Sequence, residues 1–316
     1  MTHAPWESPE WVAHADEQMT EALHRAGRPP TGAGSTVKKW ARSLVRTIPT
    51  AAGTVWVKHS YRLPPGEEVV VGELFPRYSD SAPNCPLPDV IAHWPGGYAM
   101  EPILGEELTA EHPLEVWVRA AETIAKFAAA ERAHAAAWVE RGVRDRRPSH
   151  WQSAVEALLE SPVLGTLDAE VRRGLDRFVP DFIDRYVRGF RSPATLVHQD
   201  SGSCNLHLTP TRCVLFDWAD VIVGHATFSC DRLLDQAPSP FHAPVIEAFC
   251  RGAEIPLEEF RAMRRSNVLH EVLRYHDELA HIDPECETAH SLARSVRSQI
   301  EVLIAHETKR ASKSDP

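Results

Sequence analysis

The first hundred residues carry short apolar runs separated by breaker residues, which is the pattern of β-strands rather than of long helices. Residues 37–50 and 53–63 predict two strands. Residues 89–94 and 96–104 predict two more, divided by a Pro-Gly-Gly turn. This part of the chain is therefore predicted to be mostly antiparallel β-structure with one or two helices.

Two segments among these strands are candidates for the helices. Residues 8–25 predict an amphipathic helix with Ser8 as its N-cap and Pro9 at its first position. Residues 64–79 suit either a helix or, because of their valines, a strand. The apolar face of that second helix would consist of Val69, Leu74 and Phe75.

Beyond residue 103 the apolar positions recur every three or four residues, which is typical of amphipathic helices. Three helices are predicted within residues 151–164, 171–190 and 287–307. Another begins near Pro113, and its apolar face is made of Leu114, Trp117, Ala121, Ile124 and Ala128.

The change of pattern predicts an α+β fold in two lobes. A small β-rich N-lobe would comprise residues 1–102, and a larger, mainly helical C-lobe would comprise residues 103–316. A hinge is expected near residues 100–103.

Composition excludes several classes of protein without changing this picture. The chain has 316 residues, and its net charge of −10 disfavours nucleic acid and anionic membranes as partners. No apolar run approaches the ~20 residues of a membrane span, and the N-terminus lacks a signal-peptide pattern. None of the six cysteines forms a C-x-x-C pair. We therefore expect a cytoplasmic protein with free thiols; the sequence leaves its oligomeric state open.

One polar stretch just after a short apolar run has the composition of a catalytic loop. It reads HQDSGSCN and places His198, Asp200 and Asn205 in the spacing H-x-D-x-x-x-x-N. A second apolar run, a dozen residues later, leads into Asp217, and a strand-like run in the N-lobe ends in Lys58.

Phosphoryl transfer from a nucleotide to a hydroxyl needs residues of these types. It needs a carboxylate to take the hydroxyl proton, oxygen ligands for Mg²⁺ and a cation on the phosphates. Asp200 suits the first role, and Lys58 suits the third. Asn205 and Asp217 suit the second. His198 is expected to brace the loop, and taken singly each residue could also be an ordinary turn, loop or strand-end residue.

With these residues in place, the chain resembles the aminoglycoside phosphotransferase family, small-molecule kinases with a protein-kinase-like fold. The family's loop is close to HGDLHPGN, and residues 198–205 keep its His, Asp and Asn. Its second motif is close to IDWGDASVGHP. The stretch FDWADVIVGHA keeps Asp217, Trp218, Asp220, Gly224 and His225 of that motif. The resemblance runs from about residue 37 to 235 and implies ATP or GTP as donor, a Mg²⁺ cofactor and a small-molecule hydroxyl acceptor.

The resemblance also implies a Lys–Glu pair and a nucleotide site in the N-lobe. Glu73 is the preferred partner of Lys58, and Glu68 is the second choice. The base of the nucleotide is expected in the interlobe cleft against the hinge, with Met100 beside it. No Gly-rich loop precedes the lysine, so Ser43 is expected to cover the phosphates instead.

The chain departs from the family beside the acceptor. Gln199 stands where the family usually has Gly, and residues 201–204 replace Leu-His-Pro-Gly, so the substrate pocket is expected to be unusual. Ser229 occupies the place of a later family Asp, and Asp231 follows two residues on. No G-x-x-x-x-G-K-[ST] is present, which excludes a P-loop kinase.

Three classes of function stay open. An active small-molecule kinase is favoured over a kinase fold that binds a ligand without turnover, because the base and both metal ligands are intact. A protein kinase is disfavoured because D-F-G and A-P-E motifs are lacking. Within the first class, a natural-product antibiotic is the preferred acceptor, and a sugar or an amino alcohol is the alternative.

Several charged residues have no assigned part in this chemistry. Four carboxylates could face an amine-bearing or polyhydroxylated acceptor, or could simply solvate their helices: Asp231, Asp235, Glu271 and Asp277. Residues 144–147, RDRR, are expected to form a solvated turn. Asp220 and His225 are expected to brace the second motif.

Overall fold

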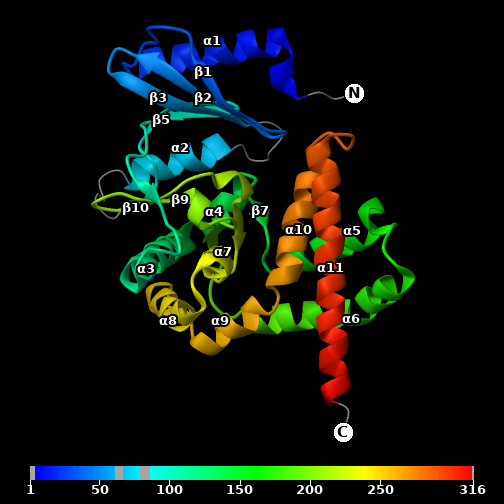
Figure 1. The fold of residues 1–316 in the computed structure, drawn as a ribbon. Coiled ribbons are helices and arrows are strands. Elements are labelled where there is room, and N and C mark those ends of the chain that lie inside the picture. Colours follow the sequence, from blue (N-terminus) through cyan, green and yellow to red (C-terminus); the bar gives the residue numbers. More distant parts are fainter. Residues whose placement is uncertain (1–3, 61–66, 79–85, 315–316) are drawn as a thin grey trace.

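The N-lobe is one antiparallel sheet with a helix over each face (Figure 1). The computed structural model describes residues 4–60, 67–78 and 86–314. The strands are ordered β1-β2-β3-β5-β4. In chain order the elements are η1 Pro5–Glu7, α1 Pro9–Arg25, β1 Ser35–Lys39, β2 Ser43–Thr50, β3 Gly53–Ser60, α2 Glu67–Tyr78, β4 Val90–Trp94 and β5 Gly97–Met100.

Helix α1 covers the outer face of the sheet, away from the C-lobe (Figure 1). The Ser8 hydroxyl accepts the N–H of Trp11 at 3.3 Å, and Pro9 occupies the first turn, as predicted. Met19 and Leu23 of α1 are buried with strand residues such as Val57 in one apolar cluster. The helix is therefore an integral layer of this lobe.

Two predictions on this lobe need correction or completion. Residues 37–50 are not one strand, because the chain turns at residues 40–42 and forms the antiparallel β1–β2 hairpin. The segment that suited helix or strand is helix α2 where it is described. Its buried apolar residues are Val70, Val71 and Leu74, whereas Phe75 is only partly buried.

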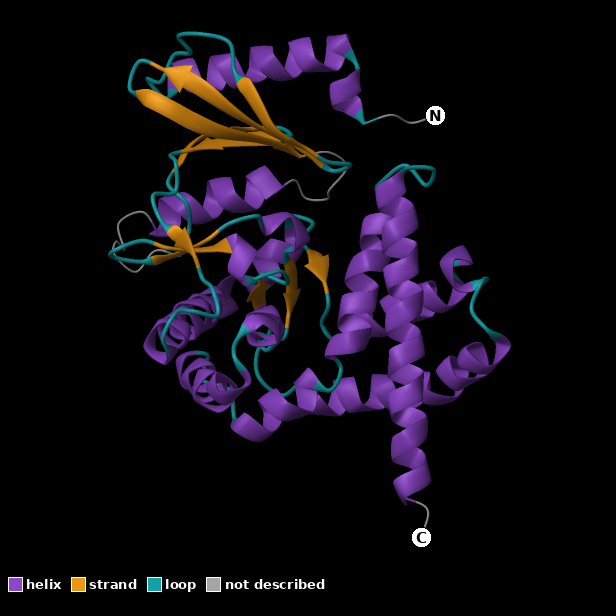
Figure 2. Cartoon of the chain, in the orientation of Figure 1, coloured by secondary structure: helices purple, strands orange, loops and turns teal. Residues whose placement is uncertain are grey.

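The C-lobe is mainly helical, with two small sheets at its centre (Figure 2). The strands form β10-β9-β6 and β7-β11-β8. The strands are β6 Glu106–Glu107, β7 Arg144–Asp145, β8 Thr195–Val197, β9 Leu206–Leu208, β10 Cys213–Leu215 and β11 Ile222–Gly224. The helices are α3 Leu114–Glu131, α4 Ala135–Glu140, α5 Pro148–Glu160, α6 Ala169–Gly189, α7 Phe228–Gln236, α8 His242–Gly252, α9 Leu257–Arg264, α10 Asn267–Leu279 and α11 Glu287–Ser314. Short 3₁₀ turns are η3 Arg132–His134, η4 Pro162–Leu164, η5 Ser203–Asn205, η6 Trp218–Asp220 and η7 Ser239–Phe241.

One continuous apolar core joins the two lobes. The buried face of α2 packs in the same cluster as Trp117 and Ile124 of α3, and as Leu206 and Leu215 of the β9–β10 hairpin. The helical face predicted for α3 is confirmed, and Trp117, Trp138 and Trp151 are fully buried. An antiparallel N-terminal region followed by a helical C-terminal region confirms the predicted fold class; the boundary at residues 102 and 103 stays a prediction.

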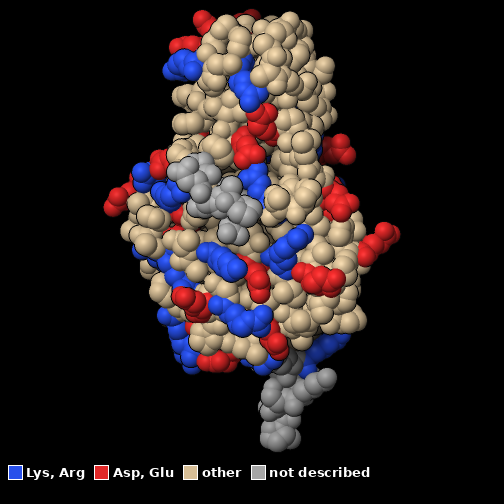
Figure 3. Space-filling view, turned by 90° about the vertical axis from the view of Figure 1, so that its left-hand side faces the viewer, with Lys and Arg blue, Asp and Glu red and all other residues tan. Residues whose placement is uncertain are grey.

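The cysteines, the helix composition and the surface charges bear on the remaining predictions. Five cysteines are free in the described part of the chain; Cys85 lies outside it. Among the described helices, none combines the length and the apolar composition that crossing a membrane requires. On the face shown in Figure 3, basic and acidic side chains of the C-lobe are interspersed rather than gathered by sign.

Candidate active site

The loop that follows β8 is held in place from two sides. The His198 backbone N–H donates to the Ser229 hydroxyl at 3.2 Å, and the Ser201 hydroxyl donates to the Ser229 carbonyl. Burial lowers the pKa of His198, so its neutral ring can donate from Nε2 to the Phe216 carbonyl, 3.0 Å away. His198 therefore braces the loop, as predicted. Ser229, where the family usually has Asp, supplies part of the support.

The loop directs the Asp200 carboxylate toward two nitrogen donors. Asn205 Nδ2 donates to Asp200 Oδ2 at 3.0 Å and to the Asp200 carbonyl at 2.9 Å. Arg232 Nε, on α7, donates to Oδ1 at 3.2 Å. The Asp200 side chain keeps 26% of its surface exposed. A carboxylate that is oriented yet accessible can accept a proton from a bound hydroxyl.

Asp217 lies beside Asn205 because a backbone hydrogen bond connects the two segments. The N–H of Phe216 donates to the Asn205 carbonyl at 3.1 Å. Asp217 itself has a left-handed backbone, with φ 63° and ψ 65°. Such a conformation is unfavourable for a residue with a Cβ, and it is found preferentially at functional sites. It sets the carboxylate off the end of β10, where 43% of the side chain is exposed.

Lys58 on β3 connects Asp217 to the N-lobe. Its Nζ lies 2.6 Å from Asp217 Oδ1 and 2.6 Å from Glu67 Oε2. Glu73 was the preferred partner, but it pairs with Arg141 at 2.5 Å. Glu68, the second choice, accepts the N–H of Gly96 at 3.0 Å. Both choices were wrong, and the partner of Lys58 is Glu67.

Helical geometry explains the correction. Positions 67, 70, 71 and 74 share one face of α2, and the last three are its buried apolar residues. Glu67 is therefore carried inward to the sheet, while Glu73 projects to the outer side, where it meets an arginine of α4's C-terminal turn. The same spacing is present in the sequence and favours Glu67 over Glu73, although Glu68 is also buried.

Glu67 fixes the position of the lysine. It is 1% exposed and accepts the Trp218 N–H at 2.6 Å and the Tyr98 hydroxyl at 3.1 Å. Burial lowers the pKa of Lys58, but the Asp217 and Glu67 carboxylates outweigh burial and raise it. Burial raises the pKa of Asp217, and the Lys58 ammonium lowers it by more. Lys58 and Asp217 therefore form a charged pair at neutral pH.

The corrected pair leads to a direct comparison of variants. Glu67→Gln should reduce kcat at least ~10-fold, because a buried charge-assisted contact to Lys58 is weakened and the lysine loses its orientation. Glu73→Gln, the matched control on the same helix, should leave kcat within about two-fold, since its partner is an exposed arginine. Steady-state phosphoryl transfer measures both variants. Equal losses in the two would contradict the assignment of Glu67.

The β1–β2 hairpin reaches the C-lobe through a residue that sequence reasoning did not single out. Arg42, at the turn beside Ser43, donates to Asp220 Oδ1 at 3.1 Å and lies 3.4 Å from Glu278. Ser43 itself begins β2, is buried and faces Ser60 in the strand register. The hairpin therefore covers this side of the site, and a role of Ser43 at the phosphates stays a prediction.

The connection between the lobes borders a hollow. Its lining includes Glu101, Pro102 and Leu104 of the connection, and Thr209 and Arg212 of the β9–β10 turn. Met100 lies at the end of β5, directly before this connection. A contact of Met100 with a nucleotide base stays a prediction.

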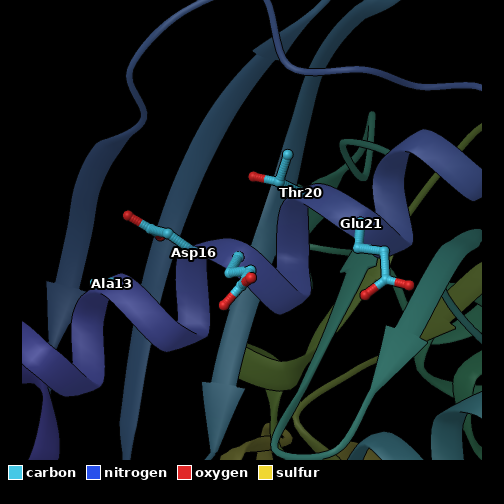
Figure 4. A pocket seen from close by; sticks show the side chains of 5 residues that line it. Ala13, Asp16, Thr20 and Glu21 are labelled. Atoms are coloured by element: carbon cyan, nitrogen blue, oxygen red, sulfur yellow. The ribbon is translucent and has the colours of Figure 1, made fainter.

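A separate hollow on α1 is not part of the site. It is lined by Ala13, Asp16, Glu17, Thr20 and Glu21 (Figure 4). Asp16 is paired with Arg46 of β2. This hollow lies on the outer helix of the N-lobe, on the other side of the sheet from α2 (Figure 1).

The residues predicted to hold Mg²⁺ suit that ion. Among the described residues no three His, Cys, Asp or Glu side chains gather as a closed metal site. Mg²⁺ does not require one, because it is commonly held by one or two protein oxygens together with phosphates and water. The amide nitrogen of Asn205 donates to Asp200, so its amide oxygen remains available as a metal ligand. Asp217 accepts from Lys58 through Oδ1, so its Oδ2 remains available as a metal ligand.

The carboxylates that had no assigned part in the chemistry are all paired with arginines. Asp231 is buried against Arg264 at 3.2 Å, and Glu271 lies 2.9 Å from Arg274. The arginines of residues 144–147 do not form a solvated turn, because two of them pair with Asp277. Asp231, Glu271 and Asp277 therefore take part in ion pairs within the protein, whereas Asp235 keeps 46% of its side chain exposed; contact of any of them with an acceptor stays a prediction.

The second motif is braced as expected. Asp220 accepts hydrogen bonds from Arg42 and, at 3.0 Å, from Arg274 Nη1. Burial raises the pKa of Asp220, but the charges of these arginines outweigh burial and lower it. His225 Nε2 lies 3.0 Å from Glu259 Oε1, and both residues are buried. These contacts hold β11 and its flanking turns in place.

The chain matches a phosphotransferase family and shares the fold of solved phosphotransferases. A model of the phosphotransferase enzyme family matches residues 73–265. No curated protein matches the chain. Among solved structures, the chain is similar to the apoenzyme of macrolide 2'-phosphotransferase MphH from Brachybacterium faecium, with 17% identity, coverage of 88% of this chain and 97% of that chain, and a TM-score of 0.62.

Two further structures show the same fold. The GDP and kanamycin complex of APH(2'')-IIia has 14% identity, covers 94% of this chain and 99% of that chain, and has a TM-score of 0.64. A choline/ethanolamine kinase family protein from Mesorhizobium loti has 15% identity, covers 93% of this chain and 94% of that chain, and has a TM-score of 0.62. At these identities the likeness establishes the fold, which is that of protein-kinase-like small-molecule phosphotransferases.

Proposed function

Because the chain belongs to the phosphotransferase enzyme family, we propose that it transfers the γ-phosphoryl group of ATP or GTP to a hydroxyl of a natural-product antibiotic and so inactivates the drug. Small-molecule phosphotransfer follows from the family and the fold. The donor nucleotide, the acceptor and the resistance role are the proposed part.

One observation carries the proposal: hydrogen bonds connect Asp200, Asn205 and the segment of Asp217 to one another, and connect Asp217 to Lys58 of the N-lobe. Asp200 contacts Asn205, Asn205 is bonded to the residue before Asp217, and Asp217 contacts Lys58. A fold without catalytic activity has no need to keep a general base, two metal ligands and a cation for the phosphates connected by hydrogen bonds. This supports an active enzyme over a binding protein without turnover.

Each residue has a defined part in the proposed reaction. Asp200 accepts the proton of the acceptor hydroxyl as the hydroxyl oxygen attacks the γ-phosphorus, and the bond from that phosphorus to the β–γ bridging oxygen breaks, which releases the nucleoside diphosphate. Lys58, held by Glu67, contacts the phosphate oxygens once a nucleotide is bound. Mg²⁺, when bound to Asn205 and Asp217, would neutralise charge that builds on the phosphates. The hairpin turn with Arg42 and Ser43 shields this region.

An antibiotic acceptor is supported by two of the similar proteins, because one is a macrolide 2'-phosphotransferase and the other was solved with kanamycin bound. An aminoglycoside, a peptide and a nucleoside drug all carry suitable hydroxyls. A phosphate would add about −1.5 to −2 charge at neutral pH, which spoils the fit of a drug to its target. The similar choline/ethanolamine kinase family protein supports the second candidate, a metabolic kinase of a sugar or an amino alcohol. We place the protein in the cytoplasm, without nucleic-acid or membrane partners, in accordance with its net charge of −10.

Drug tolerance tests the proposal. Expression of the chain in a sensitive bacterium should raise the inhibitory concentration of at least one natural-product antibiotic by about four-fold or more, and Asp200→Asn should erase the gain. The variant is the matched control, because its charge change is confined to the base. If no drug in a broad panel responds while a sugar or an amino alcohol is turned over in vitro, the metabolic alternative replaces the antibiotic.

A further inference from the structure

Each acidic group of the two helices beside the base lies close to an arginine. Helix α7 contains Asp231 and Asp235, and α10 contains Glu271, Asp277 and Glu278. Each of the five lies within 4.0 Å of an arginine nitrogen: the partners are Arg264, Arg232, Arg274, Arg144 and Arg42, in that order. The negative charge of this region is therefore already compensated within the protein.

The pairs of α10 merge into one network through Asp220. Asp220 contacts both Arg42 and Arg274, and Arg274 also contacts Glu271. Glu271 is close enough to Asp200 and Arg232 for their charges to act on it. Burial raises the pKa of Glu271, and burial and Asp220 raise that of Glu278 to about 7, which lowers the negative charge further.

Arg232 is the cation in direct contact with the base. Its side chain is 31% exposed and contacts Asp200 on one side and Asp235, which is 46% exposed, at 3.7 Å on the other. Arg274, in contrast, is 5% exposed and fully engaged with carboxylates. Because Arg232 Nε is bound to Asp200, a substrate whose hydroxyl approaches Asp200 also comes close to the guanidinium of Arg232.

A cationic acceptor suits these surroundings poorly. Capture of a polyamine or a quaternary amine needs carboxylates that remain free to face it, and like charges brought together in a partly desolvated site repel each other. A guanidinium instead donates hydrogen bonds in a planar fork to carboxylate, phosphate, carbonyl or amide oxygens.

From this geometry, and on the basis of the proposed phosphotransfer, we infer that the acceptor is an uncharged or anionic hydroxyl compound that presents an oxygen to Arg232. Arg232 is then a specificity-determining residue. The inference separates the acceptor from polyamine aminoglycosides and from choline-like amino alcohols. Nucleoside and peptide natural products keep the required chemistry.

An acceptor panel with the full chain, Mg²⁺ and ATP or GTP tests the inference. The probes are kanamycin and choline as cations, uridine as a neutral nucleoside, and N-acetylserine and glycerate as anions. Transfer is read from the gain of phosphate mass on each probe, and nucleotide hydrolysis without any acceptor is read in parallel. We expect the best uncharged or anionic probe to exceed both cations at least ~10-fold in kcat/KM, which is the ratio for one lost or repelled contact in a binding site.

Charge reversal supplies the second arm. Arg232→Glu should lower kcat/KM for the preferred probe at least ~10-fold and raise it for kanamycin, whereas Arg232→Gln should mainly raise the KM for the preferred probe. A merely structural role would not invert the charge preference. Arg188→Glu is the matched control, since Arg188 is 71% exposed on α6 and pairs with Asp184 of its own helix.

The outcomes separate the inference from the function on which it rests. Best turnover with kanamycin or choline would overturn the inference and leave phosphotransfer standing. If nothing in the panel is turned over while acceptor-free hydrolysis persists, the inference about the acceptor is contradicted, and a wider library of hydroxylated compounds decides whether any acceptor is phosphorylated. If the wild-type chain neither hydrolyses the nucleotide nor transfers phosphate to any probe, the proposed function itself is contradicted. If Arg232→Glu does not fold, the KM of Arg232→Gln and the wild-type acceptor panel test the inference.

Discussion

The Asp217→Asn variant should lose turnover by at least ~1000-fold and should no longer bind nucleotide in a Mg²⁺-dependent way. The carboxylate contacts Lys58 through Oδ1 and has Oδ2 left for the metal, so an amide removes the charge on which both contacts depend. Loss of one preorganised electrostatic group costs ~100- to 1000-fold in turnover, and here two are weakened at once. The left-handed backbone at this position tolerates asparagine nearly as well as aspartate, so the fold should be kept.

Calorimetry with and without Mg²⁺ measures this effect. The wild type should bind nucleotide weakly until Mg²⁺ is added, and the variant should show the weak affinity in both conditions. Asp184→Asn, an exposed carboxylate on α6, is the control for a change of one charge. Identical affinities in wild type and variant, with and without the ion, would contradict a metal-binding role for Asp217.

The Asp200→Asn variant should turn over at least ~100-fold more slowly, while its nucleotide affinity stays near that of the wild type. The factor is the usual one for a positioned general base. An asparagine at this position can still accept from Asn205, so the loop should keep its shape. The contacts of Asp200 are to Asn205 and Arg232 and do not include Lys58, which is why nucleotide binding should be spared.

Lys58→Ala provides the contrast to this base variant. It removes a cation that would contact the nucleotide before and during the reaction, so both affinity and turnover should fall. Single-turnover kinetics together with nucleotide titration distinguish the two patterns. Normal turnover in Asp200→Asn would remove Asp200 as the base.

Local pattern was sufficient for much of this fold. The α3 face, the N-cap of α1 and the two C-lobe motifs could be read from the sequence, because each depends on residues a few positions apart. The turn that divides β1 from β2 consists of Trp-Ala-Arg, without Gly, Pro, Asn or Asp, so no local signal marked it. The helix state of α2 was ambiguous because its valines suit either state.

Charge partners were harder to predict, since they are chosen in three dimensions. Arg42 and Asp220 are 178 residues apart, and no spacing rule connects them. Two carboxylates of α7 and α10 pair with an arginine three residues away on the same helix, but the partners of Asp231 and Asp277 lie on other elements and have no local signal. For Glu67 part of the signal is local: once residues 67–78 are taken as a helix, its periodicity favours Glu67 over Glu73, although Glu68 is buried too.

The central claim is that Asp200 takes a proton from a small-molecule hydroxyl as a phosphoryl group is transferred to it. Incubation of the full chain with labelled ATP or GTP, Mg²⁺ and a library of hydroxylated metabolites and antibiotics, followed by mass spectrometry, tests it most directly. The account predicts that at least one compound gains ~80 Da, the mass of HPO₃ added in phosphoryl transfer, with wild-type protein, and that the same compound stays unmodified with Asp200→Asn under equal conditions. A gain of equal size and rate with the variant, or phosphate released only to water with every compound, would contradict it.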